Sequence, residues 1–143
     1  MICYGFNQEQ MVRCTIKADI IGYGMYHTAF VVEETDKDNI DKVKKLYIAN
    51  HSYGSIQKNI FIANHVIMVA CGKNHTAFIS SVNSREGDLY IINDNSDDYM
   101  VKHKASRVLT VACGRYHTAF IANEIPDFIT NNSIANKSLY VFG

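Results

Sequence analysis

Gly114-Arg-Tyr-His-Thr-Ala-Phe120 repeats a pattern that the chain also carries as Gly24-Met-Tyr-His-Thr-Ala-Phe30 and Gly72-Lys-Asn-His-Thr-Ala-Phe78. A short apolar run precedes each copy, and the three histidines stand 48 and 42 residues apart. Internal similarity at a period of roughly 20 to 50 residues is typical of solenoids and propellers, whose units bury their apolar faces against one another. The sequence therefore predicts a tandem-repeat fold.

A second element recurs in the same phase. It reads Leu46-Tyr-Ile-Ala-Asn50, Leu89-Tyr-Ile-Ile-Asn93 and Leu139-Tyr-Val-Phe-Gly143, and Met1-Ile-Cys-Tyr-Gly5 is similar. The order Val-Ala-Cys-Gly, His-Thr-Ala-Phe, turn, Leu-Tyr-x-x-Gly resembles the tandem repeat of the regulator of chromosome condensation family. The resemblance covers nearly the whole chain. It implies that each repeat forms one blade of antiparallel strands, of which about seven close a β-propeller.

The chain departs from the family pattern in one signature. The aromatic-Gly-x-Asn element followed by Gly-Gln-Leu-Gly survives only as Tyr4-Gly5-Phe6-Asn7, and Asn50 and Asn93 stand where later copies would have the glycine.

From these repeats we expect an all-β protein of tandem antiparallel β-sheet blades, a partial β-propeller of about three blades. The repeats cover approximately residues 1–49, 50–92 and 93–143. Propellers typically use about four to eight blades, so the array is expected to be incomplete and to self-associate through its open blade edges. Strands are predicted over residues 1–5, 11–16, 28–33, 46–49, 59–63, 66–71, 76–80, 89–93, 99–101, 107–113 and 139–143, and residues 18–23 lead into the first Gly-x-x-His motif.

The connections between these strands differ in length. Residues 34–45 form the longest charged segment, which favours a solvated loop, with a partner-binding loop as the alternative. Residues 50–57 are interpreted as a turn, and 83–88 are short enough for a hairpin, whereas 123–138 are long. One face of the array is therefore expected to carry two variable loops and one tight turn, as the binding faces of repeat scaffolds do.

The composition fits a packed globular interior, with 48% hydrophobic and 20% charged residues, one proline, no tryptophan and a formal net charge of zero. A neutral balance gives no electrostatic footprint for nucleic acid, and Lys102-His103-Lys104 with Arg107 is interpreted as a solvated turn. No apolar stretch reaches the roughly 18 residues that span a bilayer, and no signal-peptide pattern begins the chain. The expected location is cytoplasmic or nuclear, without membrane association.

Cys71 and Cys113 hold the same position in successive repeats, which Tyr23 takes in the first copy. No partner cysteine recurs within the repeat, so we expect reduced thiols that pack as small hydrophobic groups. The pairs Cys71 with His75 and Cys113 with His117 raise the alternative of a zinc site with two thiolates and two imidazoles. Equivalent positions fall in neighbouring blades, however, and Tyr23 breaks the pattern. We therefore predict no metal.

Structural histidines are the interpretation that we favour. Each is expected to be held at the start of a strand by backbone hydrogen bonds, with Thr28, Thr76 or Thr118 assisting. The glycine three residues before each histidine indicates a backbone turn that only glycine adopts easily. The acidic turn at 94–98 lacks the glycine and the spaced ligands of a calcium loop.

No catalytic constellation follows from the remaining residues, which contain neither a Gly-x-Ser-x-Gly motif nor a phosphate-binding glycine loop. We expect no catalytic, cofactor-binding or metal-binding residues, and a non-enzymatic module that binds another protein through its loop face. The family resemblance keeps one alternative, a guanine nucleotide exchange factor for a small GTPase. Some members of the family perceive ultraviolet light through tryptophans in the Gly-x-x-His-Thr motif. This chain contains no tryptophan, so we reject that function. An inactive fragment of a longer propeller protein is the third alternative.

Overall fold

The structure is a computed structural model that describes the backbone of residues 3–7, 10–14, 18–35, 41–52, 55–56, 60–83, 85–93, 101–123 and 136–143. Side chains are described within these ranges from residue 18 onward, except at 50–56. The predicted turn at 94–98 and most of the long connection at 123–138 lie outside the described residues.

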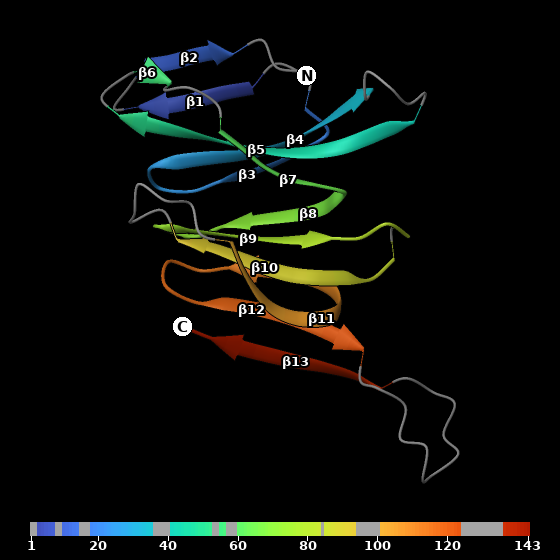
Figure 1. The fold of residues 1–143 in the computed structure, drawn as a ribbon. Coiled ribbons are helices and arrows are strands. Elements are labelled where there is room, and N and C mark those ends of the chain that lie inside the picture. The colour runs from blue at the N-terminus through green and yellow to red at the C-terminus, as the bar shows by residue number, and fades with distance from the viewer. Residues whose placement is uncertain are drawn as a thin grey trace, which may run out of the picture.

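The described residues contain thirteen antiparallel strands and no helix, so the prediction of an all-β fold is confirmed (Figure 1). The strands are β1 Cys3–Asn7, β2 Gln10–Cys14, β3 Ile20–Tyr23, β4 His27–Thr35, β5 Lys42–Ser52, β6 Ser55–Ile56, β7 Ile60–Asn64, β8 Val66–Cys71, β9 His75–Ser80, β10 Gly87–Asn93, β11 Val101–Cys113, β12 Thr118–Asn123 and β13 Lys137–Phe142. Within these residues no helix is long and apolar enough to cross a membrane.

Strands that follow one another in sequence are mostly neighbours in space. β1 pairs with β2; β3, β4 and β5 pair in order, with β6 and β7 both on β5; and β8 to β13 form one six-stranded sheet. Figure 1 shows these sheets following one another from the N-terminal to the C-terminal end. Such local pairing is what a tandem repeat with short connections produces.

The six-stranded sheet changes direction within β11. The first half of this strand pairs with β10 and the second half with β12, and Val108 pairs on both sides. Figure 1 shows β11 as a curved ribbon. Arg107, immediately before Val108, has φ 59°, in the left-handed region that a residue with a side chain enters only at a cost. His65 has φ 57° at the equivalent point between β7 and β8. A single residue thus turns the chain from one repeat into the next at both junctions.

A stacked aromatic pair marks the same place in each repeat. Phe30 lies opposite Tyr47, with ring centroids 5.8 Å apart. The pair Phe78 and Tyr90 repeats this arrangement at 5.3 Å, and Phe120 and Tyr140 repeat it at 5.1 Å. Cross-strand aromatic pairs stabilise antiparallel sheets, so all three repeats are fastened by the same contact.

Two apolar clusters lie between successive repeats. The first joins β4 and β5 to β8, β9 and β10; its buried members are Ala29, Val31, Leu46, Ile48, Val66, Val69, Phe78 and Ile92. The second joins β9 and β10 to β11 and β12 through Ala77, Ile79, Leu89, Ile91, Val108, Val111, Phe120 and Ala122. Fully burying one large aliphatic or aromatic side chain is worth about 1.5 to 3 kcal/mol, so these clusters stabilise the packing of one repeat on the next.

Much of the charged segment at 34–45 is strand, which corrects the prediction of a loop; residues 36–40 lie outside the described residues. β4 continues to Thr35 and β5 begins at Lys42, because the two strands pair as far as Thr35 opposite Lys42. The paired strands place Lys45 Nζ 3.3 Å from Glu34 Oε2. Tyr47 donates a hydrogen bond of 2.7 Å to Glu34 Oε1. Opposite charges on facing strands explain why a charge-rich sequence remains in the sheet.

Two other predicted turns are also strands. Residues 102–104 belong to β11, where Lys102 and His103 pair with β10. In the predicted turn at 50–57, β5 continues to Ser52 and pairs with β6. Both errors have one cause, since polar residues at the ends of long strands carry no alternating apolar signal.

Candidate functional site

Three Gly-x-x-His turns lie at one end of the sheets and connect β3 to β4, β8 to β9 and β11 to β12. In each turn the glycine N–H donates to the histidine carbonyl. The distances are 2.9 Å for Gly24 and His27, 2.8 Å for Gly72 and His75, and 2.8 Å for Gly114 and His117. The repeated sequence therefore makes the same backbone turn each time.

Successive turns also touch one another. Lys73 N donates to Arg115 O at 3.0 Å. A Cβ added to Gly24 would lie 2.7 Å from the carbonyl oxygen of Gly72, and one added to Gly72 would lie 2.7 Å from that of Gly114. These contacts are closer than real Cβ atoms show, so two of the turns have room only for glycine.

The physical reason for the glycines differs from the predicted one. None of the three turn glycines has a φ in the left-handed region. The histidine ring of the same turn occupies the space instead, because a Cβ on Gly24 would lie 2.4 Å from His27 Cε1 and one on Gly72 would lie 2.0 Å from His75 Cε1. At Gly24 and Gly72 glycine is required because neighbouring atoms leave no room for a Cβ, and not because of the backbone conformation.

Each of the first two histidines bonds to the threonine of the following repeat. His27 Nε2 lies 2.8 Å from Thr76 Oγ1, and His75 Nε2 lies 3.1 Å from Thr118 Oγ1. The sequence predicted that threonines assist the histidines, and the structure adds that the bond crosses from repeat to repeat. His117, in the third repeat, is exposed.

The cysteines lie beside the same threonines. Cys71 Sγ is 3.7 Å from Thr76 Oγ1, and Cys113 Sγ is 3.7 Å from Thr118 Oγ1. Both thiols are free. Burial raises the pKa of the Cys113 thiol, while the hydrogen bond with Thr118 acts in the opposite direction. Among residues with described side chains, no three His, Cys, Asp or Glu residues lie together as a metal site would require.

Large side chains project from the turns into solvent. We call this surface the turn face, and it consists of Tyr23, Met25, Tyr26, Lys73, Arg115 and Tyr116. The four apolar or aromatic members are between 50% and 56% exposed. A shallow hollow crosses all three turns between Tyr23, Met25, Lys73 and Arg115, with the three glycines and both free cysteines at its base. Aromatic residues, Met and Arg are the types enriched in protein interfaces.

Two cations lie on one exposed tyrosine of the turn face. Lys73 Nζ is 5.6 Å and Arg115 Cζ is 5.2 Å from the centroid of the Tyr116 ring. Lys73 Nζ also donates to Tyr116 Oη at 3.4 Å. Neither cation forms an ion pair with any carboxylate of the described residues. Tyr116 also borders a second hollow that contains Lys102 and Lys104, so positive charge surrounds it.

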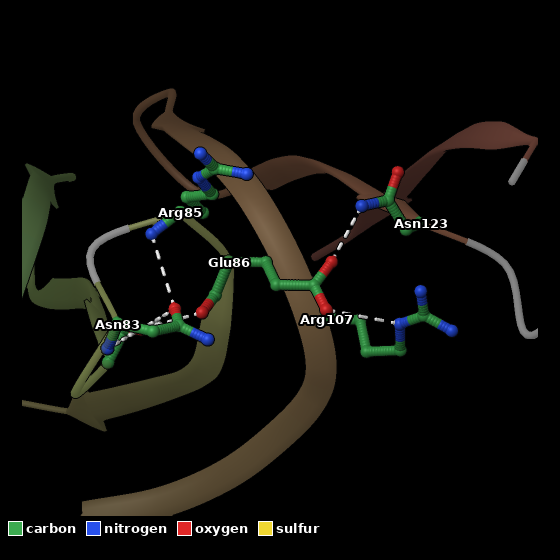
Figure 2. A network of polar contacts seen from close by, with 6 residues as sticks. Asn83, Arg85, Glu86, Arg107 and Asn123 are labelled. Carbon is green, nitrogen blue, oxygen red and sulfur yellow. Dashed lines mark hydrogen bonds and ion pairs between the residues drawn. The ribbon is translucent and has the colours of Figure 1, made fainter.

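A polar network fastens the opposite end of the sheets (Figure 2). Glu86 Oε1 accepts from Arg107 Nε at 3.3 Å, and its Oε2 accepts from Asn123 Nδ2 at 2.6 Å. Asn83 Oδ1 accepts from Arg85 N at 3.3 Å and so shapes the short loop that carries Glu86. The network joins this loop to β11 and β12, which indicates a structural role for Glu86.

Sequence reasoning missed both the turn face and this network. The first position between glycine and histidine differs in every copy, as Met25, Lys73 and Arg115, and the second is Tyr26, Asn74 and Tyr116. That variation inside an invariant frame was the available signal for a surface. Glu86 offered none, because its partners come from β11 and β12 and no repeat rule predicts them. No family model, no curated protein and no solved structure matches this chain.

Proposed function

We propose that this chain is a non-enzymatic protein-interaction module of propeller-type repeats, which binds an acidic segment of another protein on its turn face. The finer fold in this proposal is a partial β-propeller of about three blades, of the chromosome-condensation-regulator type. Sheets that pack in sequence order, one-residue junctions at His65 and Arg107, and turns that line up at one end support it. Because one fold can serve many functions, the proposed binding function is argued from the residues of the turn face.

The exposed Tyr116 between Lys73 and Arg115 carries the proposal. A half-exposed ring flanked by cations without an ion-pair partner among the described residues offers two kinds of contact together. The rings of Tyr116 and Tyr26 and the thioether of Met25 can bury apolar area, while the cations attract carboxylates. Most residues of the long connections that the sequence indicated as a binding face lie outside the described residues, whereas every side chain of the turn face is described.

A site-specific photocrosslinking experiment tests the proposal. A photoreactive phenylalanine analogue replaces Tyr116, or Val82 as control, because Val82 is 86% exposed in the short loop at the other end of the sheets. Cells of the source organism are irradiated, and the adducts are identified by mass spectrometry. We expect one protein to crosslink at Tyr116 and not at Val82, through a segment rich in Asp and Glu.

Charge reversal supplies the second arm. Lys73→Glu with Arg115→Glu should abolish the adduct, whereas Lys42→Glu, at the opposite end of β5, should leave it intact. Added salt should weaken capture, since exposed charges are screened over about 10 Å at 0.1 M ionic strength. Equal crosslinking at Val82, or an adduct that survives the double reversal, would contradict the proposal.

The exchange-factor alternative makes a different prediction. A nucleotide exchange factor accelerates release of a fluorescent guanine nucleotide from its GTPase, and an interaction module does not. We expect no acceleration with small GTPases from the same organism at any concentration of this chain. Acceleration that Lys73→Glu with Arg115→Glu removes would replace the proposal with the exchange-factor function. An inactive fragment would yield neither a specific adduct nor acceleration.

A further inference from the structure

The same cross-strand apolar pairs recur on one face of every repeat. In the first repeat Ala29 faces Ile48 and Val31 faces Leu46; in the second, Ala77 faces Ile91 and Ile79 faces Leu89; in the third, Ala119 faces Val141 and Ile121 faces Leu139. We call this surface the back face of a repeat. Alternate residues of a strand point to the same side of the sheet. Because the strand pairing is the same in all three repeats, each back face presents apolar side chains at the same four positions.

The three back faces differ in what covers them. All four back-face residues of the first repeat are 0% exposed, and those of the second are at most 6% exposed. On the third repeat Leu139 is 68% and Val141 is 62% exposed. Exposed apolar side chains of this size on a sheet face indicate an interaction surface when they adjoin one another.

The occupant of a back face is visible twice within the chain. The first strand of the following repeat lies on it, through Val66 and Val69 of β8 in one case and through Val108 and Val111 of β11 in the other. A Cβ on Gly22 of β3 would lie 3.4 Å from Val69 Cγ1, which shows how closely β8 approaches the preceding repeat. Any occupant of the third back face should therefore present a strand of this kind.

One such strand in the chain has an open side. β3 is the first strand of the first repeat, and Ile21 holds the position of Val69 and Val111. Ile21 is 44% exposed, whereas Val69 and Val111 are 9% and 7% exposed. Tyr23, two residues further on the same side of β3, is 52% exposed. Elsewhere on this face of the repeat Phe30 and Ala49 are already buried, so the open area is the strip along β3.

We propose that the back face of the third repeat binds the β3 strip of a second copy of this chain, head to tail. Leu139 and Val141 of one copy would then meet Ile21 of the other, as Leu46 and Ile48 meet Val69 within the chain. The turn face shares only Tyr23 with this contact, and its other members are not used in it.

When a back face binds a β3 strip, the assembly keeps one unbound back face at one end and one unbound β3 strip at the other. Head-to-tail association therefore continues to a ring or an open filament, whereas a self-complementary contact stops at a dimer. This difference makes the geometry of the proposal testable with single substitutions that place a charge on one surface at a time.

Sedimentation velocity at micromolar concentrations provides the test. Wild type should associate further as concentration rises. Val141→Lys and Ile21→Lys should each be monomeric, and an equimolar mixture of the two should form a dimer and nothing larger, because only one intact pair of surfaces remains. Val82→Lys, a change at an exposed site outside both surfaces, should associate as wild type does.

Several results would overturn the proposal. Wild type could remain monomeric, Val141→Lys could associate by itself, or the mixture of the two variants could stay monomeric. Dimers of Ile21→Lys alone would also contradict the proposal, because they would indicate that two back faces bind each other. Both substituted residues are exposed, so the variants should fold, and circular dichroism checks that they do. Leu139→Lys repeats the back-face test at a separate position.

Discussion

His27 Nε2 lies 2.8 Å from Thr76 Oγ1, although the two residues are 49 positions apart in sequence. Both side chains are buried, at 1% and 0% exposure, and they belong to successive repeats. His75 repeats the contact with Thr118 at 3.1 Å. Burying polar groups without partners is costly, so these bonds favour the one stacking register in which histidine meets threonine.

Removing the threonine hydroxyl should therefore destabilise the protein. Thr76→Val preserves the side-chain shape but leaves the His27 imidazole without this partner, and we expect a loss of about 1 to 3 kcal/mol in the free energy of unfolding. Urea denaturation followed by circular dichroism measures it. Thr35→Val, at an exposed strand end, is the control and should change the free energy little. Equal effects of the two substitutions would refute the role of the hydrogen bond.

The turn glycines provide a matched pair of substitutions. Gly72→Ala places a Cβ 2.0 Å from His75 Cε1 and 2.7 Å from the carbonyl oxygen of Gly114, whereas at Gly114 the nearest atom is 3.9 Å away. Overpacking of this kind costs about 1 to 3 kcal/mol, so Gly72→Ala should lower the unfolding midpoint and Gly114→Ala should not. If both variants unfolded at the same urea concentration, close packing at the second turn would be wrong.

Sequence reasoning predicted the features that depend on local periodicity. β8 matches its predicted range, β9 begins one residue earlier than predicted, and β7 is displaced by one residue at each end, because apolar runs and repeated motifs define strands directly. The antiparallel all-β class followed from the same signals. Membership of the chromosome-condensation-regulator family, and with it the propeller, remains a prediction.

Contacts that cross between repeats could not be predicted in the same way. The sequence shows that histidine and threonine recur together, but not that His27 bonds to Thr76 of the following repeat. The strand pairing of Lys42 to Lys45 depends on facing charges in β4, which no window of sequence reveals. The turn face could not be predicted for a similar reason, since it depends on the contact between Tyr116 and Lys73, which are 43 residues apart in sequence.

Stability should fall at alkaline pH through Tyr47. Burial, together with the hydrogen bond and the negative charge of Glu34, raises the pKa of Tyr47 from 10.0 to about 12. Between these values the unfolded chain releases this proton and the folded chain keeps it, so the contribution present below pH 10 is lost as pH rises to about 12.

Tyr47→Phe isolates this effect from the other tyrosines. The free energy of unfolding of wild type should fall more steeply than that of the variant between pH 10 and 12. Parallel pH profiles of the two proteins would show that the phenol of Tyr47 has an ordinary pKa.

The Cys113 thiol should react slowly in the folded protein. Because burial raises its pKa, less thiolate forms at a given pH, and the thiolate is the nucleophile. Alkylation by iodoacetamide, quantified by mass spectrometry of the peptide that contains Cys113, should have a pH midpoint above that of the chain in urea. An unchanged or lower midpoint in the folded protein would be inconsistent with the raised pKa of this half-buried thiol.

The order in which the repeats stack is the claim on which the turn face, the back face and both proposals depend. Nuclear Overhauser effects between the His27 ring and the Thr76 methyl group, in protein labelled at histidine and threonine, measure it directly. We predict a cross-peak for His27 with Thr76 and another for His75 with Thr118, both lost in Thr76→Val and Thr118→Val respectively. Cross-peaks that instead join each histidine only to the threonine next to it in sequence would contradict this stacking.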